Sequence, residues 1–143
     1  MNKPKKILVA VDLSDEAKQV LQRGMELAEF YHADLHLIHV IEPVALNSPY
    51  ELSPSLPNNM QSILKQRAEN YLARLAEDLK IKDAPRTVGI GSVKSQLFQV
   101  AKDQGIDLIV VGTHGRHGIG LLLGSTATAV LHGTPCDVYA VKI

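Results

Sequence analysis

The spacing of hydrophobic and polar positions changes several times along the chain. Residues 7–11 (Ile-Leu-Val-Ala-Val) form a continuous apolar run, which is typical of a strand covered on both faces. From Ser14 the apolar residues recur at helical spacing, and Asp15 and Glu16 fall where acidic side chains suit the first turn of a helix. A second strand is predicted over residues 34–40. This succession of strand, helix and strand indicates a βαβ unit.

The rest of the chain repeats that alternation. Residues 42–59 hold four of the seven prolines and predict a long loop of the kind that is usually functional or mobile. The elements predicted after it are a helix from Asn58 or Asn59 to about Lys80, a strand over 86–90, a helix from Ser92 to Gln104 that Gly105 ends, a strand over 107–112, a helix through Ala127, Val130 and Leu131 that ends at Gly133, and a strand over 136–141. The pattern therefore predicts an α/β fold, in which a five-stranded parallel sheet has helices on both faces and right-handed crossovers.

Composition narrows the class of protein further. A chain of 143 residues predicts a single domain over 1–143. Fifteen Lys and Arg residues balance fifteen Asp and Glu residues, so no net charge favours nucleic acid as a partner. The single cysteine, Cys136, excludes an intramolecular disulfide. The apolar run near the N-terminus stops at Asp12, too early for a signal peptide or a membrane span, so we expect a cytoplasmic protein without membrane contact.

Candidate chemistry lies where the predicted strands end, because ligands of open parallel sheets bind outside the carboxyl ends of the strands. The richest of these segments is 112–125, in which glycines allow backbone amides to approach an oxyanion closely. Gly124, Ser125 and Thr126 would offer amides and hydroxyls at the start of a helix. Such a segment serves either to bind phosphate or only as a tight turn. It matches neither G-x-G-x-x-G nor the P-loop pattern, which disfavours a P-loop NTPase.

The motifs together resemble the universal stress protein family over nearly the whole chain. They are Lys6-Ile-Leu-Val-Ala-Val-Asp-Leu-Ser14, Leu37-Ile-His-Val40, Asp107-Leu-Ile-Val-Val-Gly-Thr-His-Gly-Arg-His-Gly118, Leu122-Leu-Gly-Ser-Thr126 and Pro135-Cys-Asp-Val138. The resemblance implies a Rossmann-like sheet of the adenine nucleotide alpha hydrolase type with strand order 3-2-1-4-5. It also implies a cytoplasmic homodimer joined through its last strands.

The family contains members that bind ATP and members that do not. The ATP-binding pattern is Gly, two residues, Gly, nine residues, Gly, then Ser or Thr. Gly112, Gly115, Gly124 and Ser125 supply every named position, but eight residues separate Gly115 from Gly124 here. The resemblance therefore leaves two interpretations open, an ATP-binding stress-response module and a nucleotide-independent dimeric scaffold.

If ATP binds, the resemblance assigns a role to each matching position. Asp12 would lie near the ribose and adenine, Ala10 and Val40 would meet adenine through backbone or apolar contact, and Gly112 and Gly115 would border the ribose and phosphates. Gly124, Ser125 and Thr126 would hold the phosphates, and Arg116 would add a positive charge. Mg²⁺ would bind through the phosphates and not in a protein cage. The candidate nucleotide-binding residues are thus Ala10, Val11, Asp12, Val40, Gly112, Gly115, Arg116, Gly124, Ser125 and Thr126.

Histidine and cysteine positions predict little further chemistry. His114 and His117 could share a metal, but no third ligand is placed beside them, and we predict no metal site. The other histidines are expected to be structural hydrogen-bonding residues; they are His32, His36, His39 and His132. Cys136 is expected to be a small apolar filler in a buried strand.

Catalysis is not expected. The chain has no Gly-x-Ser-x-Gly motif, and related nucleotidyltransferases would carry a His-x-x-His or His-x-Gly-His motif where this chain has Asp12-Leu-Ser14. Because no general base for attack by water can be identified, we predict no catalytic residues and at most a slow, incidental ATPase.

Overall fold

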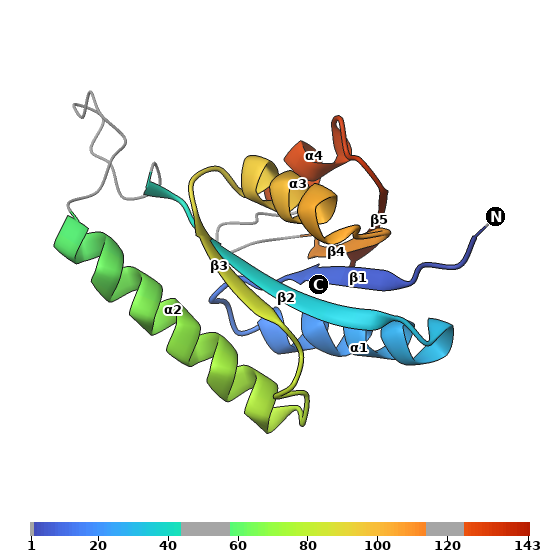
Figure 1. Ribbon diagram of the computed structural model, residues 1–143, viewed down its shortest axis with the longest axis horizontal. Helices are drawn as coiled ribbons and strands as arrows, with labels where there is room; N and C mark the ends of the chain where they lie inside the picture. The colour runs from blue at the N-terminus through green and yellow to red at the C-terminus, as the bar shows by residue number, and fades with distance from the viewer. Residues whose placement is uncertain (1, 44–57, 114–124) are drawn as a thin grey trace.

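The computed structural model describes residues 2–43, 58–113 and 125–143. Figure 1 shows a single twisted sheet between two layers of helices, and its strand order is β3-β2-β1-β4-β5 with every pair parallel. The strands are β1 (Lys6–Ala10), β2 (Asp34–Ile41), β3 (Arg86–Ile90), β4 (Leu108–Gly112) and β5 (Asp137–Val141). The helices are α1 (Ala17–Tyr31), α2 (Asn58–Asp78), α3 (Val93–Gln104) and α4 (Ser125–Leu131). The predicted fold class and strand order are confirmed.

The central strand β1 explains why the sequence begins with a continuous apolar run. Val9 is paired with Leu37 of β2 on one side and with Val110 of β4 on the other. Because successive side chains point to opposite faces of a sheet, Ile7 and Val9 pack toward α1, whereas Leu8 packs toward α3 and α4. With helices over both faces, no position in the middle of β1 can be polar without a buried partner.

The first helix begins later than the sequence predicts. We expected a helix from Ser14 with Asp15 and Glu16 in its first turn, but α1 begins at Ala17 and Glu16 is the N-cap residue. The reason is local: the Asp12 carboxylate accepts hydrogen bonds from both the backbone and the hydroxyl of Ser14. Such side-chain bonds hold a turn and compete with helix formation.

The boundaries of α2 and α3 test where the sequence predicts these helices to begin and end. The Ser92 hydroxyl accepts a hydrogen bond of 3.1 Å from the Ser95 amide and caps α3, while Gly105 ends the helix at φ 66°. Both features are confirmed. Helix α2 ends at Asp78, slightly before the predicted Lys80, which takes up a left-handed backbone at φ 61°.

Strand β5 departs from the predicted buried strand. It occupies the edge of the sheet with β4 as its sheet neighbour, and only Val141 of its five residues is buried. Cys136 lies just before the strand and is half-buried, so its predicted place inside a buried strand is wrong. It does pack against the apolar layer under α3 and α4, and this burial raises the pKa of its thiol.

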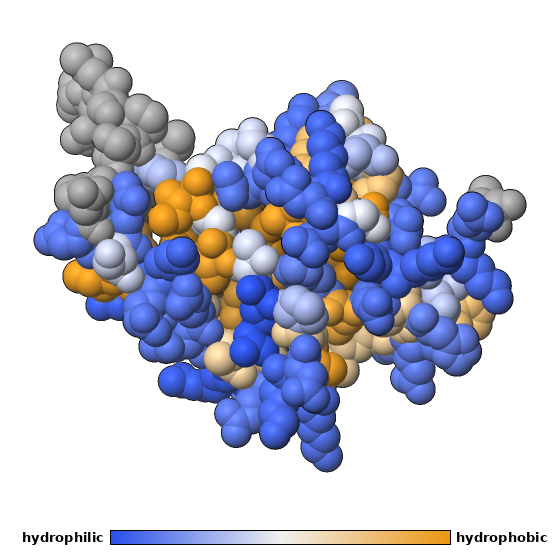
Figure 2. All heavy atoms as spheres, viewed as in Figure 1, coloured by the Kyte–Doolittle hydropathy of each residue, from blue (hydrophilic) through white to orange (hydrophobic). Residues whose placement is uncertain are grey.

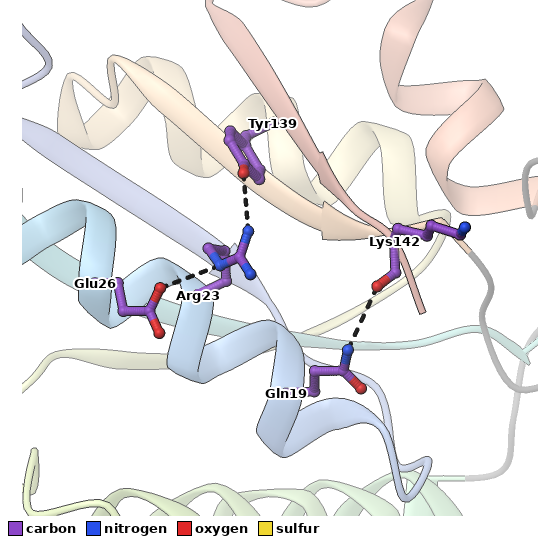
Figure 3. A network of polar contacts seen from close by, with 5 residues as sticks. All are labelled: Gln19, Arg23, Glu26, Tyr139 and Lys142. Atoms are coloured by element: carbon purple, nitrogen blue, oxygen red, sulfur yellow. Dashed lines mark hydrogen bonds and ion pairs between the residues drawn. The ribbon is translucent and has the colours of Figure 1, made fainter.

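Helix α1 fastens this edge strand through polar side chains (Figure 3). Arg23 Nη1 donates to the Tyr139 hydroxyl at 3.0 Å and also pairs with Glu26 at 3.2 Å. One turn earlier, Gln19 Nε2 donates to the Lys142 carbonyl at 3.4 Å. The end of the chain is therefore held against α1.

None of the helices in the part of the chain that the structure describes has the length and apolar character needed to cross a bilayer.

Candidate functional site

The carboxyl ends of β1, β2 and β4 meet where the strand order reverses. From β1 the chain builds β2 and β3 on one side, then crosses back to place β4 on the opposite side of β1. In open α/β sheets, ligands bind outside the carboxyl ends of the strands at such a reversal of strand order. Ala10, Val40 and Gly112 are half-buried at this edge.

The backbone of Val11 is held at both of its polar groups just beyond β1. Its amide donates to the Ile38 carbonyl at 2.8 Å, and its carbonyl lies 2.7 Å from Nδ1 of His39. A carbonyl oxygen can only accept, so His39 must carry a hydrogen on Nδ1. Two consecutive residues of β2 thus fix the last residue before the chain leaves the sheet.

The next residue, Asp12, has a defined orientation. Its Oδ1 accepts from the Ser14 amide at 3.0 Å and from the Ser14 hydroxyl, and the side chain is half-buried. Oδ2 accepts from none of the residues in the described part of the chain. The carboxylate is therefore fixed by one oxygen and can accept a ligand hydroxyl or amino group with the other.

Tyr71 of α2 is a neighbour of this loop that the sequence analysis missed. Burial raises the pKa of its phenol, and the charges of Asp12 and Asp15 raise it further. The phenol of Tyr71 therefore interacts electrostatically with both carboxylates. Its helical spacing marks it only as a position on the apolar face of α2, and nothing in the sequence signals its electrostatic interaction with Asp12 and Asp15.

The end of β4 is tied to the end of the chain. The Thr113 amide donates to the Val141 carbonyl at 2.9 Å, and the Thr113 hydroxyl accepts from the Ile143 amide at 3.2 Å. Thr113, the first residue after Gly112, is thus held next to β5 by these hydrogen bonds.

The predicted site residues fall into two groups. The structure brings Ala10, Val11, Asp12, Val40 and Gly112 to one edge of the sheet, and Ser125 and Thr126 open α4. The remaining predictions lie outside the described residues; they are Gly115, Arg116 and Gly124, together with His114 and His117. Within 2–43, 58–113 and 125–143, no group of three or more His, Cys, Asp or Glu residues could hold a metal ion.

The predicted structural hydrogen bonds are confirmed for the rings of His36 and His39, whereas the bonds shown for His32 and His132 are backbone bonds that do not test the prediction. The rings of His36 and His39 bond across strands, with His36 Nε2 lying 2.8 Å from the Thr87 hydroxyl. His32 and His132 instead use backbone amides at the ends of α1 and α4. His36 is half-buried, and burial followed by the nearby charge of Lys6 lowers its pKa.

This end of the molecule also exposes apolar surface. Figure 2 shows hydrophobic residues gathered where β2 and β3 finish and α2 begins. Leu13, Met60 and Ile63 are each exposed at 44–48%. Exposed apolar side chains and an oriented carboxylate at the same end of the sheet suit a ligand with a flat apolar part and polar substituents.

The geometry defines a doubly wound α/β protein with a candidate ligand site at its topological switch point. Comparison with known proteins agrees on the fold. Residues 3–142 match the Universal stress protein family, and the chain belongs to that family.

Individual relatives cover the chain end to end. Universal stress protein A homolog 2 of Coxiella burnetii is 39% identical over 145 residues, spanning 100% of this chain and 98% of the relative. The solved structure of hypothetical protein MJ0577 has a TM-score of 0.81 at 25% identity, with 99% of this chain and 98% of that one covered. A universal stress protein solved in complex with cAMP has a TM-score of 0.62 at 23% identity and 98% coverage of both chains.

Proposed function

We infer that this universal stress protein binds ATP at the carboxyl ends of β1, β2 and β4 and acts as a dimeric signalling or protective module in the stress response. The observation that carries the proposal is the Asp12 carboxylate, which Ser14 orients at the switch point of the sheet beside the half-buried Ala10 and Val40.

The residues present fit an adenine nucleotide. Ala10 and Val40 provide an apolar border for a base, and Asp12 provides an acceptor for a ribose hydroxyl or an adenine amino group. Gly112, Ser125 and Thr126, with Gly115, Arg116 and Gly124 from the connecting segment, would hold the phosphates, and Mg²⁺ would bind through the phosphates. The relative solved with cAMP supports an adenine nucleotide as the ligand class.

The remaining parts of the proposal concern assembly and activity. We propose a cytoplasmic homodimer joined through β5, because this strand has an open edge that can pair with a second copy. The proposed role is binding and not catalysis. The sequence offers no identifiable general base for attack by water.

One observation favours a second candidate function. The spacing between Gly115 and Gly124 is eight residues, one fewer than in the ATP-binding pattern. A shorter connection between β4 and α4 would move the phosphate-binding amides relative to Asp12. The alternative is therefore a nucleotide-independent dimeric scaffold.

Native mass spectrometry of the intact protein, titrated with ATP and Mg²⁺, separates the two functions and reads the oligomer in the same spectrum. We expect one ATP per protomer on the wild type and on Asp15→Ala, which removes a carboxylate from the same loop. Asp12→Ala should lose at least about tenfold in affinity, because an acceptor hydrogen-bonded to the ligand is removed. A dimer that stays empty at millimolar ATP would favour the scaffold.

A further inference from the structure

His39 is the one polar residue that is buried among those the structure describes, with an exposed fraction of 9%. It lies on β2 opposite Val88 of β3, and strand alternation places it on the same face as the fully buried Leu37. A leucine or valine would fill such a position without the desolvation penalty of an imidazole ring. The hydrogen bonding of the ring must therefore explain why a histidine occupies this buried position.

The ring bonds the backbone at the point where β1 ends. Ala10 is the last residue of β1 in register with β2, and the backbone ladder continues for one more bond, from the Val11 amide to the Ile38 carbonyl. The Val11 carbonyl is then taken by a side chain, the Nδ1–H of His39 at 2.7 Å. The direction in which the chain leaves the sheet is thus fixed by an imidazole ring.

The bond between His39 and the Val11 carbonyl affects the next residue, Asp12. Asp12 follows Val11 directly, and among the described residues its carboxylate accepts hydrogen bonds from Ser14 of the same loop. The orientation of the Asp12–Ser14 unit relative to the sheet therefore depends on the direction in which the chain leaves β1, which the Val11 peptide sets. Fixing that peptide orders the carboxylate before any ligand arrives, and preorganisation of this kind raises affinity.

We propose that His39 is a positioning residue of the site: through the Val11 carbonyl, it holds Asp12 in the orientation that binds the nucleoside part of an adenine nucleotide. This inference rests on the proposed function. His39 itself does not touch the ligand in this account.

The substitution series separates the hydrogen bond from the bulk of the ring. His39→Leu keeps an apolar side chain but leaves the buried Val11 carbonyl without its donor. His39→Asn places an amide nitrogen near the position of Nδ1, whereas His39→Gln places it near Nε2. The matched control is His36→Leu, which removes the other ring-mediated bond of the same strand, to Thr87, away from the carboxyl end.

The measurement is the Kd for ATP by isothermal titration calorimetry, together with the backbone amide chemical shifts of Asp12, Leu13 and Ser14 in the nucleotide-free protein. We expect His39→Leu and His39→Gln to raise Kd about tenfold and to shift those amides, since a buried carbonyl is left unpaired. His39→Asn should recover most of the affinity, and His36→Leu should leave both readouts unchanged.

Three results would overturn the inference. They are unchanged affinity in a folded His39→Leu or His39→Gln variant, an equal loss in His36→Leu, and a His39→Asn variant that binds no better than His39→Gln. A wild type that fails to bind ATP would contradict the proposed function itself, and the positioning role would fall with it. That failure appears in the wild type and so cannot be confused with the other three.

Discussion

The two ends of the parallel sheet use polar groups in different ways. At the amino end, Asp107 Oδ2 accepts from the amides of Lys5 and Lys6 at 2.8 and 3.0 Å, and these bonds are exposed to solvent. At the carboxyl end, a buried histidine fixes the Val11 carbonyl and Ser14 orients the half-buried Asp12 carboxylate. The first arrangement joins neighbouring strands, whereas the second orders a group that can meet a ligand.

A cavity of about 880 Å³ lies at the amino end and not at the proposed site. Its charged lining consists of three lysines and three acidic residues, namely Lys6, Lys80, Lys82, Asp34, Glu77 and Asp83. Charges of both signs in equal number select no ligand class. The cavity and the oriented polar groups at the carboxyl ends of the strands therefore lie at opposite ends of the sheet.

The largest expected effect is on stability and comes from the packing of α1 against the middle of the sheet. Both ends of the sheet depend on this packing. A Cβ atom at Gly24 of α1 would lie 2.4 Å from Cγ2 of Val9, a buried and stiff side chain. Gly24→Val should therefore lower the free energy of unfolding by about 2–3 kcal/mol, measured by urea denaturation.

The matched background for that test is Val9→Ala, which removes the methyl group that Gly24→Val would strike. The cost of Gly24→Val should be smaller there than in the wild type. Equal costs in both backgrounds would mean that α1 does not approach β1 through these two residues.

At the amino end, Asp107→Ala should lower the free energy of unfolding by about 1–2 kcal/mol, because two backbone amides lose a charged acceptor. ATP affinity should stay within about twofold of the wild type, a difference below 1 kcal/mol. Asp137→Ala, an exposed carboxylate at the start of β5, is the control and should change stability little. A large loss of ATP binding in Asp107→Ala would contradict the proposed division of roles, in which polar groups at the amino end join strands and those at the carboxyl end meet the ligand.

At the carboxyl end of β3, Ser92→Ala removes the cap of α3 and should cost about 1 kcal/mol in unfolding free energy. Ser95→Ala removes an exposed hydroxyl one turn later while leaving the capping bond intact, and should be close to neutral. Thermal or chemical unfolding of the pair checks the difference. If both variants lose stability equally, the cap does not contribute.

The smallest expected effect is a pH dependence at the amino end. Burial lowers the pKa of His36 below its ordinary value of 6.5, so the unfolded chain takes up the proton more readily than the folded one. Stability should therefore fall as the pH drops below about 6.5 and be fully present at neutral pH. In His36→Gln, which keeps a polar group for Thr87 but does not titrate, thermal unfolding between pH 7.5 and 5.5 should change less. An identical pH profile would contradict the shift.

The sequence predicts the buried middle of the molecule better than its edges. The apolar runs of β1 and β4 and both caps of α3 follow directly from residue type, because burial and capping leave local patterns. The late start of α1 and the exposure of β5 do not, since the first depends on side-chain bonds from Asp12 and the second on position in the sheet.

The candidate site divides in the same way. Asp12, Val40 and Gly112 could be placed at one edge from strand order alone, because parallel strands bring their carboxyl ends together. The bond from His39 to Val11 joins residues 28 positions apart, and the approach of Tyr71 to Asp12 depends on the path of α2. Neither leaves a local signal in the sequence.

The most direct test of the central claim is the location of ATP on the sheet. Two-dimensional amide spectra of the ¹⁵N-labelled protein should be recorded as ATP and Mg²⁺ are added. The account predicts shifts that cluster at Val11, Asp12, Val40 and Gly112, with Lys6, His36 and Lys80 unmoved. Shifts that cluster instead around the amino-end cavity, or no shifts at millimolar ATP, would contradict a nucleotide site at the carboxyl ends of β1, β2 and β4.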